Sequence, residues 1–425
     1  MQSMTGTIEI SLSDRVDALR PSSTLAVTAL AKQLKAEGKD VLSFAAGEPD
    51  FDTPEPIKQA AIAALKAGQT KYAPAPGDPE TRRVIAEKLS IENRIPDVTA
   101  DHVVISTGGK NSLYLLFQAL LDPPSAGKQP QEVILPTPAW VSYKPQATLA
   151  GGTIIEVPAT AANDFKITPG QLAGAITPRS RVLCLNSPSN PCGTMYSPDE
   201  LAALAQVVAE AAATTCPELV ILTDEIYEKI IYGGIEHRSI GSFPEVAHRT
   251  VTVNGLSKAY AMTGWRVGYC AGSGDFGLRI AKAITKLQGQ LTTCIPTFIY
   301  PAIRTALTEC AEDVERMRQQ FAQRAELIYG RISAMPGIVC PKPTGAFYVF
   351  PDISAHFGKT TAGGAKIDSA QSFAKALLNE QLVACVPGED FLGSGPSCAR
   401  FSFACSSEQI EQGMDRLAAF LEGLH

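Results

Sequence analysis

Short apolar runs that end on small or polar residues recur along most of the chain, and this pattern limits the fold more than any other feature. Examples are 103–107 before two glycines, 181–185 before N-S-P-S-N-P, and 219–222 before T-D-E-I-Y. Helical stretches such as 110–121 and 201–213 separate these runs. Strands that alternate with helices are typical of a mostly parallel sheet in an α/β protein, where ligands bind at the carboxyl ends of strands.

The pattern changes near residue 300. Long helical stretches around 302–334 and near 369–380 accompany short strands within V-A-C-V-P-G and A-R-F-S-F-A. This change indicates a second, smaller α+β domain. An N-terminal helix, capped by Ser22 or Ser23 and ended by Gly38, is expected to pack in the same layer. The expected organisation is an N-terminal segment at 1–49 packing with the small domain, a large domain at 50–300, and the small domain at 301–425.

Composition excludes several classes of protein. The net charge is −6 and no long basic run occurs, which argues against nucleic acid or an anionic membrane as the main partner. Apolar stretches are broken before the ~18 residues of a membrane span, and the N-terminus lacks a signal-peptide pattern. The ten cysteines occur singly and without C-x-x-C pairs. They predict buried reduced thiols and a cytoplasmic protein, with no metal site.

Two segments carry side chains that suit one particular cofactor. Asp224 and Tyr227 follow the run 219–222, and N-G-L-S-K-A-Y-A-M-T-G-W-R follows a predicted strand at 250–254. The second segment holds Lys258 and leads into another predicted strand at 265–271. Pyridoxal phosphate needs an amine to form a Schiff base, an anion facing its ring nitrogen, and donors for its phosphate and phenolate oxygens. The two segments together offer these groups.

These segments closely resemble the fold-type I, class I aminotransferases, and the resemblance extends over nearly the whole chain. It includes A-G-E-P-D-F-D-T-P, P-A-W-V-S-Y, N-P-C-G and A-R-F-S-F-A. The resemblance implies the fold-type I transferase architecture, with pyridoxal 5′-phosphate bound in the large domain. It also implies a homodimer with shared active sites and a ping-pong transamination of an amino acid with a 2-oxo acid.

The resemblance also assigns roles to individual residues. The expected catalytic residues are Lys258, Asp224 and Tyr227. The residues expected to bind the cofactor are Gly108, Gly109, Trp140, Asn190, Asp224, Tyr227, Ser257, Lys258 and Arg266, together with Tyr72 of the partner subunit. The residues expected to bind the substrate are Gly47, Lys110, Trp140, Asn190 and Arg400.

The motif S-T-G-G-K is similar to the subgroup of bacterial aspartate and aspartate/prephenate aminotransferases. In that subgroup the lysine that matches Lys110 recognises the distal carboxylate of dicarboxylic substrates. The expected reaction is therefore aspartate and 2-oxoglutarate to oxaloacetate and glutamate. Prephenate, aromatic amino acids and alanine stay open as substrates, as does a carbon–sulfur lyase with the same cofactor and fold.

A dinucleotide-binding dehydrogenase is a weaker alternative. Residues 272–277 match G-x-G-x-x-G after a predicted strand. The acid expected about 20 residues later is missing, because no Asp or Glu occurs between Asp275 and Glu309. The motif also lies late in the chain, inside a stretch that the resemblance to the aminotransferases already explains.

Overall fold

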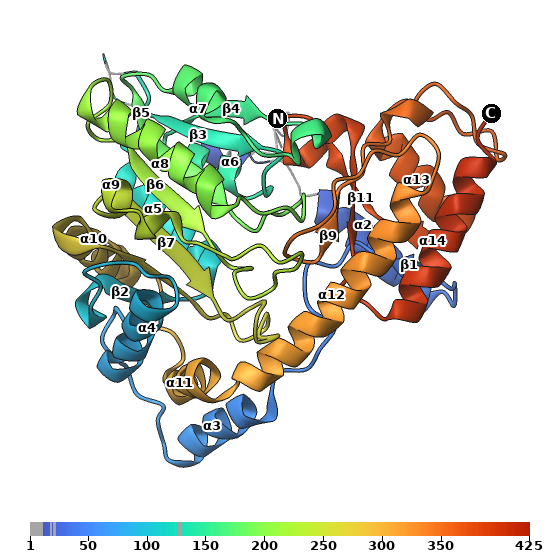
Figure 1. The fold of residues 1–425 in the computed structure, drawn as a ribbon. Helices are drawn as coiled ribbons and strands as arrows, with labels where there is room; N and C mark the ends of the chain where they lie inside the picture. The colour runs from blue at the N-terminus through green and yellow to red at the C-terminus, as the bar shows by residue number, and fades with distance from the viewer. Residues whose placement is uncertain (1–11, 18, 20–22, 124, 126, 128) are drawn as a thin grey trace, which may run out of the picture.

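The computed structural model describes residues 12–17, 19, 23–123, 125, 127 and 129–425 (Figure 1). Its main sheet has seven strands in the order β2-β8-β7-β6-β5-β3-β4. These strands are β2 (Val103–Ser106), β3 (Glu132–Thr137), β4 (Thr153–Pro158), β5 (Ser180–Asn186), β6 (Val220–Asp224), β7 (Thr250–Gly255) and β8 (Gly268–Gly272). Only β8 runs antiparallel to its neighbours in this sheet. The predicted α/β class with a mostly parallel sheet is confirmed.

Both faces of this sheet are covered by helices. In β6, Val220 and Leu222 pack in the core formed with α5 (Gly109–Leu120) and α10 (Gly274–Leu291). Ile221 points to the opposite face and packs in the core under α8 (Pro198–Ala213). All five residues of β6 are buried, as expected for a central strand of a parallel sheet.

A second layer of structure is built from the C-terminal part of the chain and the N-terminal segment (Figure 1). A three-stranded antiparallel sheet has the order β11-β12-β9. The elements of this part are β9 (Tyr348–Val349), β10 (Val383–Ala384), β11 (Val386–Pro387), β12 (Ala399–Ser402), α12 (Ala311–Ser333), α13 (Ala370–Gln381) and α14 (Ser407–Glu422). From the N-terminal segment, β1 (Leu42–Ser43) pairs in parallel with β10, and Phe44 packs in the same core as Phe321 and Phe401. The domain boundaries given above stay predictions.

The remaining helices connect these parts. They are α1 (Asp14–Asp17), α2 (Ser23–Ala36), α3 (Glu55–Lys66), α4 (Pro79–Ile91), α6 (Tyr143–Leu149), α7 (Pro169–Ala175), α9 (Pro244–Ala247) and α11 (Tyr300–Glu309). The predicted N-terminal helix corresponds to α2, which Gly38 follows with a φ of 84°. Of its two candidate caps, Ser22 lies outside the described residues. The predicted helical stretch 302–334 is divided between α11 and α12 at Cys310.

Two expectations on the strands need correction. The strand predicted at 265–271 begins only at Gly268, because Arg266 adopts a left-handed φ of 57° that ends regular extended structure before it. The strand β4 was not anticipated. It lies at the edge of the sheet, and most of its side chains are not buried, so an apolar run does not mark it.

The glycine motif at 272–277 serves packing between a strand and a helix. A Cβ on Gly277 would lie 2.4 Å from the carbonyl carbon of Gly272. Only glycine allows α10 to approach the end of β8 this closely.

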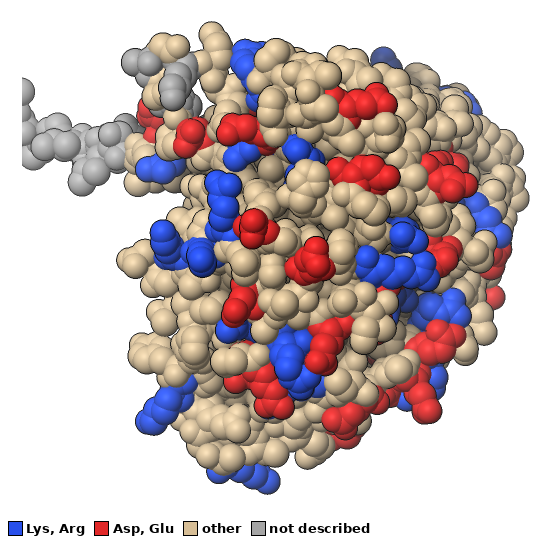
Figure 2. Space-filling model, turned by 60° about the vertical axis from the view of Figure 1, so that its left-hand side comes forward, with Lys and Arg blue, Asp and Glu red and all other residues tan. Residues whose placement is uncertain are grey.

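The surface and the cysteines fit the expectations from composition. On the face shown in Figure 2, acidic and basic side chains are interspersed. All ten cysteines are free thiols, and eight of them are buried. Among the described residues, no helix combines the length and the apolar character that crossing a membrane requires.

Candidate active site

A cavity of about 1170 Å³ lies at the carboxyl edge of the main sheet and extends to β12 and the segment after β1. Most of the residues predicted for the site line it together. They are Gly47, Gly109, Lys110, Trp140, Asn190, Asp224, Tyr227, Ser257, Lys258, Arg266 and Arg400. Gly108 directly precedes this lining at the start of α5. Tyr72 is the exception, since it lies outside the cavity and is 89% exposed.

The topology of the sheet explains this convergence. Asp224 is the last residue of β6, and Lys258 follows the end of β7 by three residues. Adjacent parallel strands end at the same edge, so residues distant in sequence meet there. Arg266 comes before its strand, yet β8 is antiparallel, so the start of β8 lies at the same edge.

Lys258 is a half-buried amine whose surroundings favour its neutral form. Its Nζ donates a hydrogen bond to the carbonyl oxygen of Gly47. Burial lowers the pKa of Lys258 to about 8, with Glu48 opposing the shift and Arg400 adding to it. Roughly a tenth of Lys258 is therefore the free amine at pH 7, far more than for a lysine with the ordinary pKa, and the free amine is the nucleophilic form.

Asp224 is a buried carboxylate held by two donors. Tyr143 donates its hydroxyl to Oδ2 at 2.8 Å, and the backbone N–H of Ile226 donates to Oδ1 at 3.3 Å. Burial raises the pKa of Asp224 to about 6. A cation placed against this carboxylate would stabilise its charged form.

Arg400 is a buried guanidinium in the wall of the cavity. Its Nη1 donates to Asn190 Oδ1 at 2.9 Å and its Nη2 donates to the carbonyl oxygen of Ala45 at 3.2 Å. Its Nε is buried without a hydrogen-bond partner, and no carboxylate of the described residues forms an ion pair with it. The guanidinium also lies 4.6 Å from the ring centroid of Tyr348. A buried cation with an unused donor is suited to bind an anionic ligand.

A second anion site is built where α5 begins. Gly108 has a φ of 92°, and a Cβ there would lie 2.6 Å from Arg266 Nη2. The guanidinium of Arg266 therefore lies directly against the backbone of Gly108. The first N–H groups of a helix and an adjacent guanidinium are typical of a phosphate site.

Lys110 lies in the first turn of α5, and its Nζ is 4.8 Å from the ring centroid of Trp140. Burial lowers the pKa of Lys110, and Arg266 adds to this effect. Both side chains line the cavity. The ammonium group is thus available to a second anionic group of a ligand bound over the tryptophan.

Two tyrosines that line the cavity were missed from the sequence. Tyr143 contacts Asp224 as described, and the Tyr348 hydroxyl lies 3.0 Å from the Tyr227 hydroxyl. Tyr143 stands three residues after Trp140 within W-V-S-Y, which was the only available signal. Tyr348 stands within G-A-F-Y-V-F-P, where an aromatic residue reads as ordinary core.

Comparison with known proteins agrees with this geometry. Residues 39–417 match the family described as aminotransferase class I and II. The aspartate aminotransferase of Bacillus subtilis (strain 168) is 43% identical over 97% of this chain and 99% of its own length. The aspartate/prephenate aminotransferase of Cereibacter sphaeroides is 42% identical over the same shares of the two chains.

Solved structures extend the comparison to the fold. The crystal structure of an aspartate aminotransferase from Rhizobium meliloti superposes with a TM-score of 0.90 at 36% identity, covering 98% of this chain and 100% of that one. The Thermus thermophilus aspartate aminotransferase with maleate gives a TM-score of 0.86 at 39% identity, covering 97% and 100%. The family match and the full-length relatives identify this chain as an aminotransferase of the class I and II family.

Proposed function

We propose that this aminotransferase uses pyridoxal 5′-phosphate to transfer the amino group of aspartate to 2-oxoglutarate, which yields oxaloacetate and glutamate. One observation carries the proposal: Asp224 and Arg400 are buried and Lys258 is half-buried around one cavity, and none of the three forms an ion pair with another described residue. The relatives named above as aspartate and aspartate/prephenate aminotransferases support the choice of substrate.

The residues present fit the proposed cofactor. The site at Gly108 and Arg266 suits its phosphate, and Ser257 adds a hydroxyl to the cavity wall. Asp224 would face the ring nitrogen, where its carboxylate would hold a proton. Tyr227 and Asn190 would donate to the phenolic oxygen, and Trp140 would stack on the ring. When bound, pyridoxal phosphate supplies an aldehyde that condenses with amines and a ring that accepts electrons from the substrate Cα.

The side chains around the substrate then have distinct tasks. Lys258 Nζ, as the free amine, would take the proton from the amino acid Cα and would deliver it to the former aldehyde carbon of the cofactor, acting as base and then as acid. Arg400 binds the α-carboxylate with two parallel hydrogen bonds, assisted by the backbone of Gly47. These hydrogen bonds orient the Cα–H bond toward Lys258. Lys110 would bind the distal carboxylate of aspartate.

A homodimer with shared active sites belongs to the same proposal. Tyr72 lies in the loop between α3 and α4 and is 89% exposed. An aromatic side chain this exposed can be covered by a second subunit, where Tyr72 of the partner subunit would reach the cofactor phosphate. A cytoplasmic location is proposed as well, on the composition alone.

Substrate choice is tested by replacing Lys110. We expect Lys110→Ala to lower kcat/KM for aspartate about tenfold, because a charge-assisted hydrogen bond at a partly solvated site is lost. The value for alanine, which lacks the distal carboxylate, should change far less. Steady-state assays with both amino acids and 2-oxoglutarate measure the difference.

Lys144→Ala is the matched control for this experiment. Lys144 also lines the cavity, but its ammonium lies 3.4 Å from Glu156 in an exposed ion pair. The Lys144→Ala variant should leave the ratio of kcat/KM for aspartate to kcat/KM for alanine unchanged. Equal losses for both amino acids in Lys110→Ala would contradict the assignment of a dicarboxylic substrate.

A further inference from the structure

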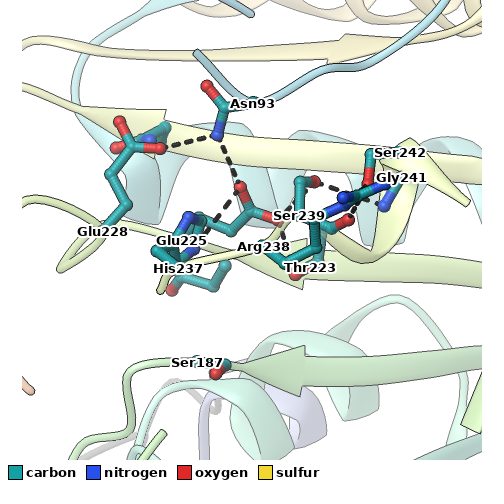
Figure 3. A network of polar contacts seen from close by, with 12 residues as sticks. Asn93, Ser187, Thr223, Glu225, Glu228, His237, Arg238, Ser239, Gly241 and Ser242 are labelled. Atoms are coloured by element: carbon teal, nitrogen blue, oxygen red, sulfur yellow. Dashed lines mark hydrogen bonds and ion pairs between the residues drawn. The ribbon is translucent and has the colours of Figure 1, made fainter. Parts of the chain in front are cut away.

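The turn after β6 has two faces with different surroundings. Asp224 and Tyr227 line the cavity. Glu225 and Glu228 lie on the back of the same turn, away from the cavity, and are only 1% and 8% exposed. Figure 3 shows these two carboxylates within a network of polar contacts behind the site. The mechanism proposed above uses neither of them.

Asn93 connects the two buried carboxylates. Its Nδ2 donates to Glu225 Oε2 at 3.0 Å and to Glu228 Oε2 at 2.7 Å (Figure 3). Lys88, in α4, donates to Asn93 Oδ1 at 2.7 Å and to Glu228 Oε1. Lys88 and Asn93 are themselves buried. Lys88 in α4 and Asn93 just after this helix thus hold the back of the turn, although they precede it by more than 130 residues.

Other contacts extend the network. Glu225 Oε1 accepts hydrogen bonds from Thr223 Oγ1 at 3.2 Å and from Ser239 Oγ at 2.7 Å. His237 Nε2 lies 4.0 Å from Glu225 Oε2. The network therefore joins the turn after β6 to the segment that carries His237 and Ser239.

The charges of the network balance within the protein. Burial raises the pKa of Glu225 to about 8, and the carboxylate of Glu228 adds to this shift. Burial opposes ionisation of Glu228 as well, but Lys88, His237 and Lys229 bring its pKa down to about 2. Near neutral pH Glu228 is therefore an anion, and Lys88 forms an ion pair with it. Glu225, Glu228 and His237 could each place a ligand atom near a metal ion, but Lys88 already supplies the cation here.

We propose that Lys88 and Asn93 are positioning residues, which fix Asp224 and Tyr227 at the cofactor by holding Glu225 and Glu228 on the opposite face of the turn. Glu225 directly follows Asp224, and Glu228 directly follows Tyr227. A shift of either glutamate therefore moves the neighbouring cavity residue through the backbone. The inference rests on the proposed function, in which Asp224 and Tyr227 contact the cofactor ring.

The test replaces Asn93, whose amide joins both carboxylates. We expect Asn93→Ala to lower kcat about 10- to 100-fold, since small displacements of reacting groups have effects of this size. The KM for aspartate should stay nearly unchanged, because Arg400 makes no contact with the network. Two readouts are independent of turnover. The dissociation constant for pyridoxal phosphate should rise, and the pH at which the bound cofactor changes colour should shift.

Glu132→Gln is the control for simple loss of a buried polar contact. Glu132 is 1% exposed and accepts hydrogen bonds from Thr177 and Arg179. It is the first residue of β3 and therefore lies at the end of the strand away from the cavity. It should lower the unfolding temperature without changing the colour transition or the cofactor affinity. If Asn93→Ala behaves in the same way as Glu132→Gln, the positioning role is overturned.

A second pair of variants decides the question if Asn93→Ala does not fold. Glu225→Gln and Glu225→Leu both remove the carboxylate, but only glutamine keeps hydrogen bonds to Asn93 and Ser239. The colour transition should shift clearly further in Glu225→Leu, and equal shifts in both variants would overturn the proposal. Wild-type protein serves as the reference. If wild type binds no pyridoxal phosphate, the proposed function itself fails, whereas normal wild type with unchanged variants rejects only the network.

Discussion

Lys258→Ala is expected to lower kcat for transamination by about 10⁴-fold or more, because it removes both the nucleophile and the group that moves the Cα proton. The cavity keeps Asp224, Arg266 and the glycines at α5, so pyridoxal phosphate should still bind without a covalent link. The unfolding temperature should not fall, since Lys258 is a half-buried amine whose ammonium form is disfavoured by the loss of solvation. Steady-state kinetics, cofactor titration and thermal unfolding measure the three effects.

An exposed lysine on α10 supplies the control. Lys282→Ala changes the same residue type far from the cavity lining and should leave turnover at the wild-type level. Residual activity of Lys258→Ala within about tenfold of wild type would be incompatible with a role in general acid–base catalysis, which is worth about 10²- to 10⁴-fold alone.

Arg400→Leu is expected to lower kcat/KM about 10²- to 10³-fold for every amino donor, because losing one partner of a buried charge pair costs about 2–5 kcal/mol. The effect should be the same for aspartate and alanine, since both carry the α-carboxylate. This pattern differs from that of Lys110→Ala, which affects only dicarboxylic substrates. Kinetics with the two amino acids separates the two residues.

Arg400→Lys refines the same test. Lysine keeps the charge but cannot form two parallel hydrogen bonds to a carboxylate, so it should recover only part of the lost activity. Full recovery by lysine would show that charge alone is needed. Loss restricted to aspartate would mean that Arg400 binds the distal carboxylate instead.

The main sheet and the meeting of Asp224 with Lys258 could be predicted because of one physical rule. Asp224 and Lys258 each follow a buried strand, and parallel neighbours end at the same edge, so their proximity follows from the pattern of apolar runs. The orientation of β8 did not follow from this pattern. An antiparallel strand has no distinct composition, and a left-handed conformation at a residue other than glycine, as at Arg266, has no signal in the sequence.

Contacts between side chains that are distant in the sequence could not be predicted from it. Tyr143 and Asp224 are 81 positions apart, and Tyr227 and Tyr348 are 121 positions apart. Neither pair has a local signal, because only the packed tertiary structure brings the hydroxyl groups to their partners. The same holds for Glu225, whose place in the D-E-I-Y-E segment gives no indication that a residue near α4 holds it. Motifs in the sequence therefore predicted the site residues. The residues that support them are identified only by the folded structure.

The absorption spectrum of the purified protein, recorded before and after adding single amino acids, tests the central proposal most directly. A yellow bound cofactor that bleaches with aspartate and with glutamate is the predicted result. Bleaching with only alanine or aromatic amino acids would keep transamination and reject the dicarboxylic substrate. Release of ammonia and pyruvate without bleaching would indicate a carbon–sulfur lyase. A protein that stays colourless after reconstitution with pyridoxal phosphate would contradict the account.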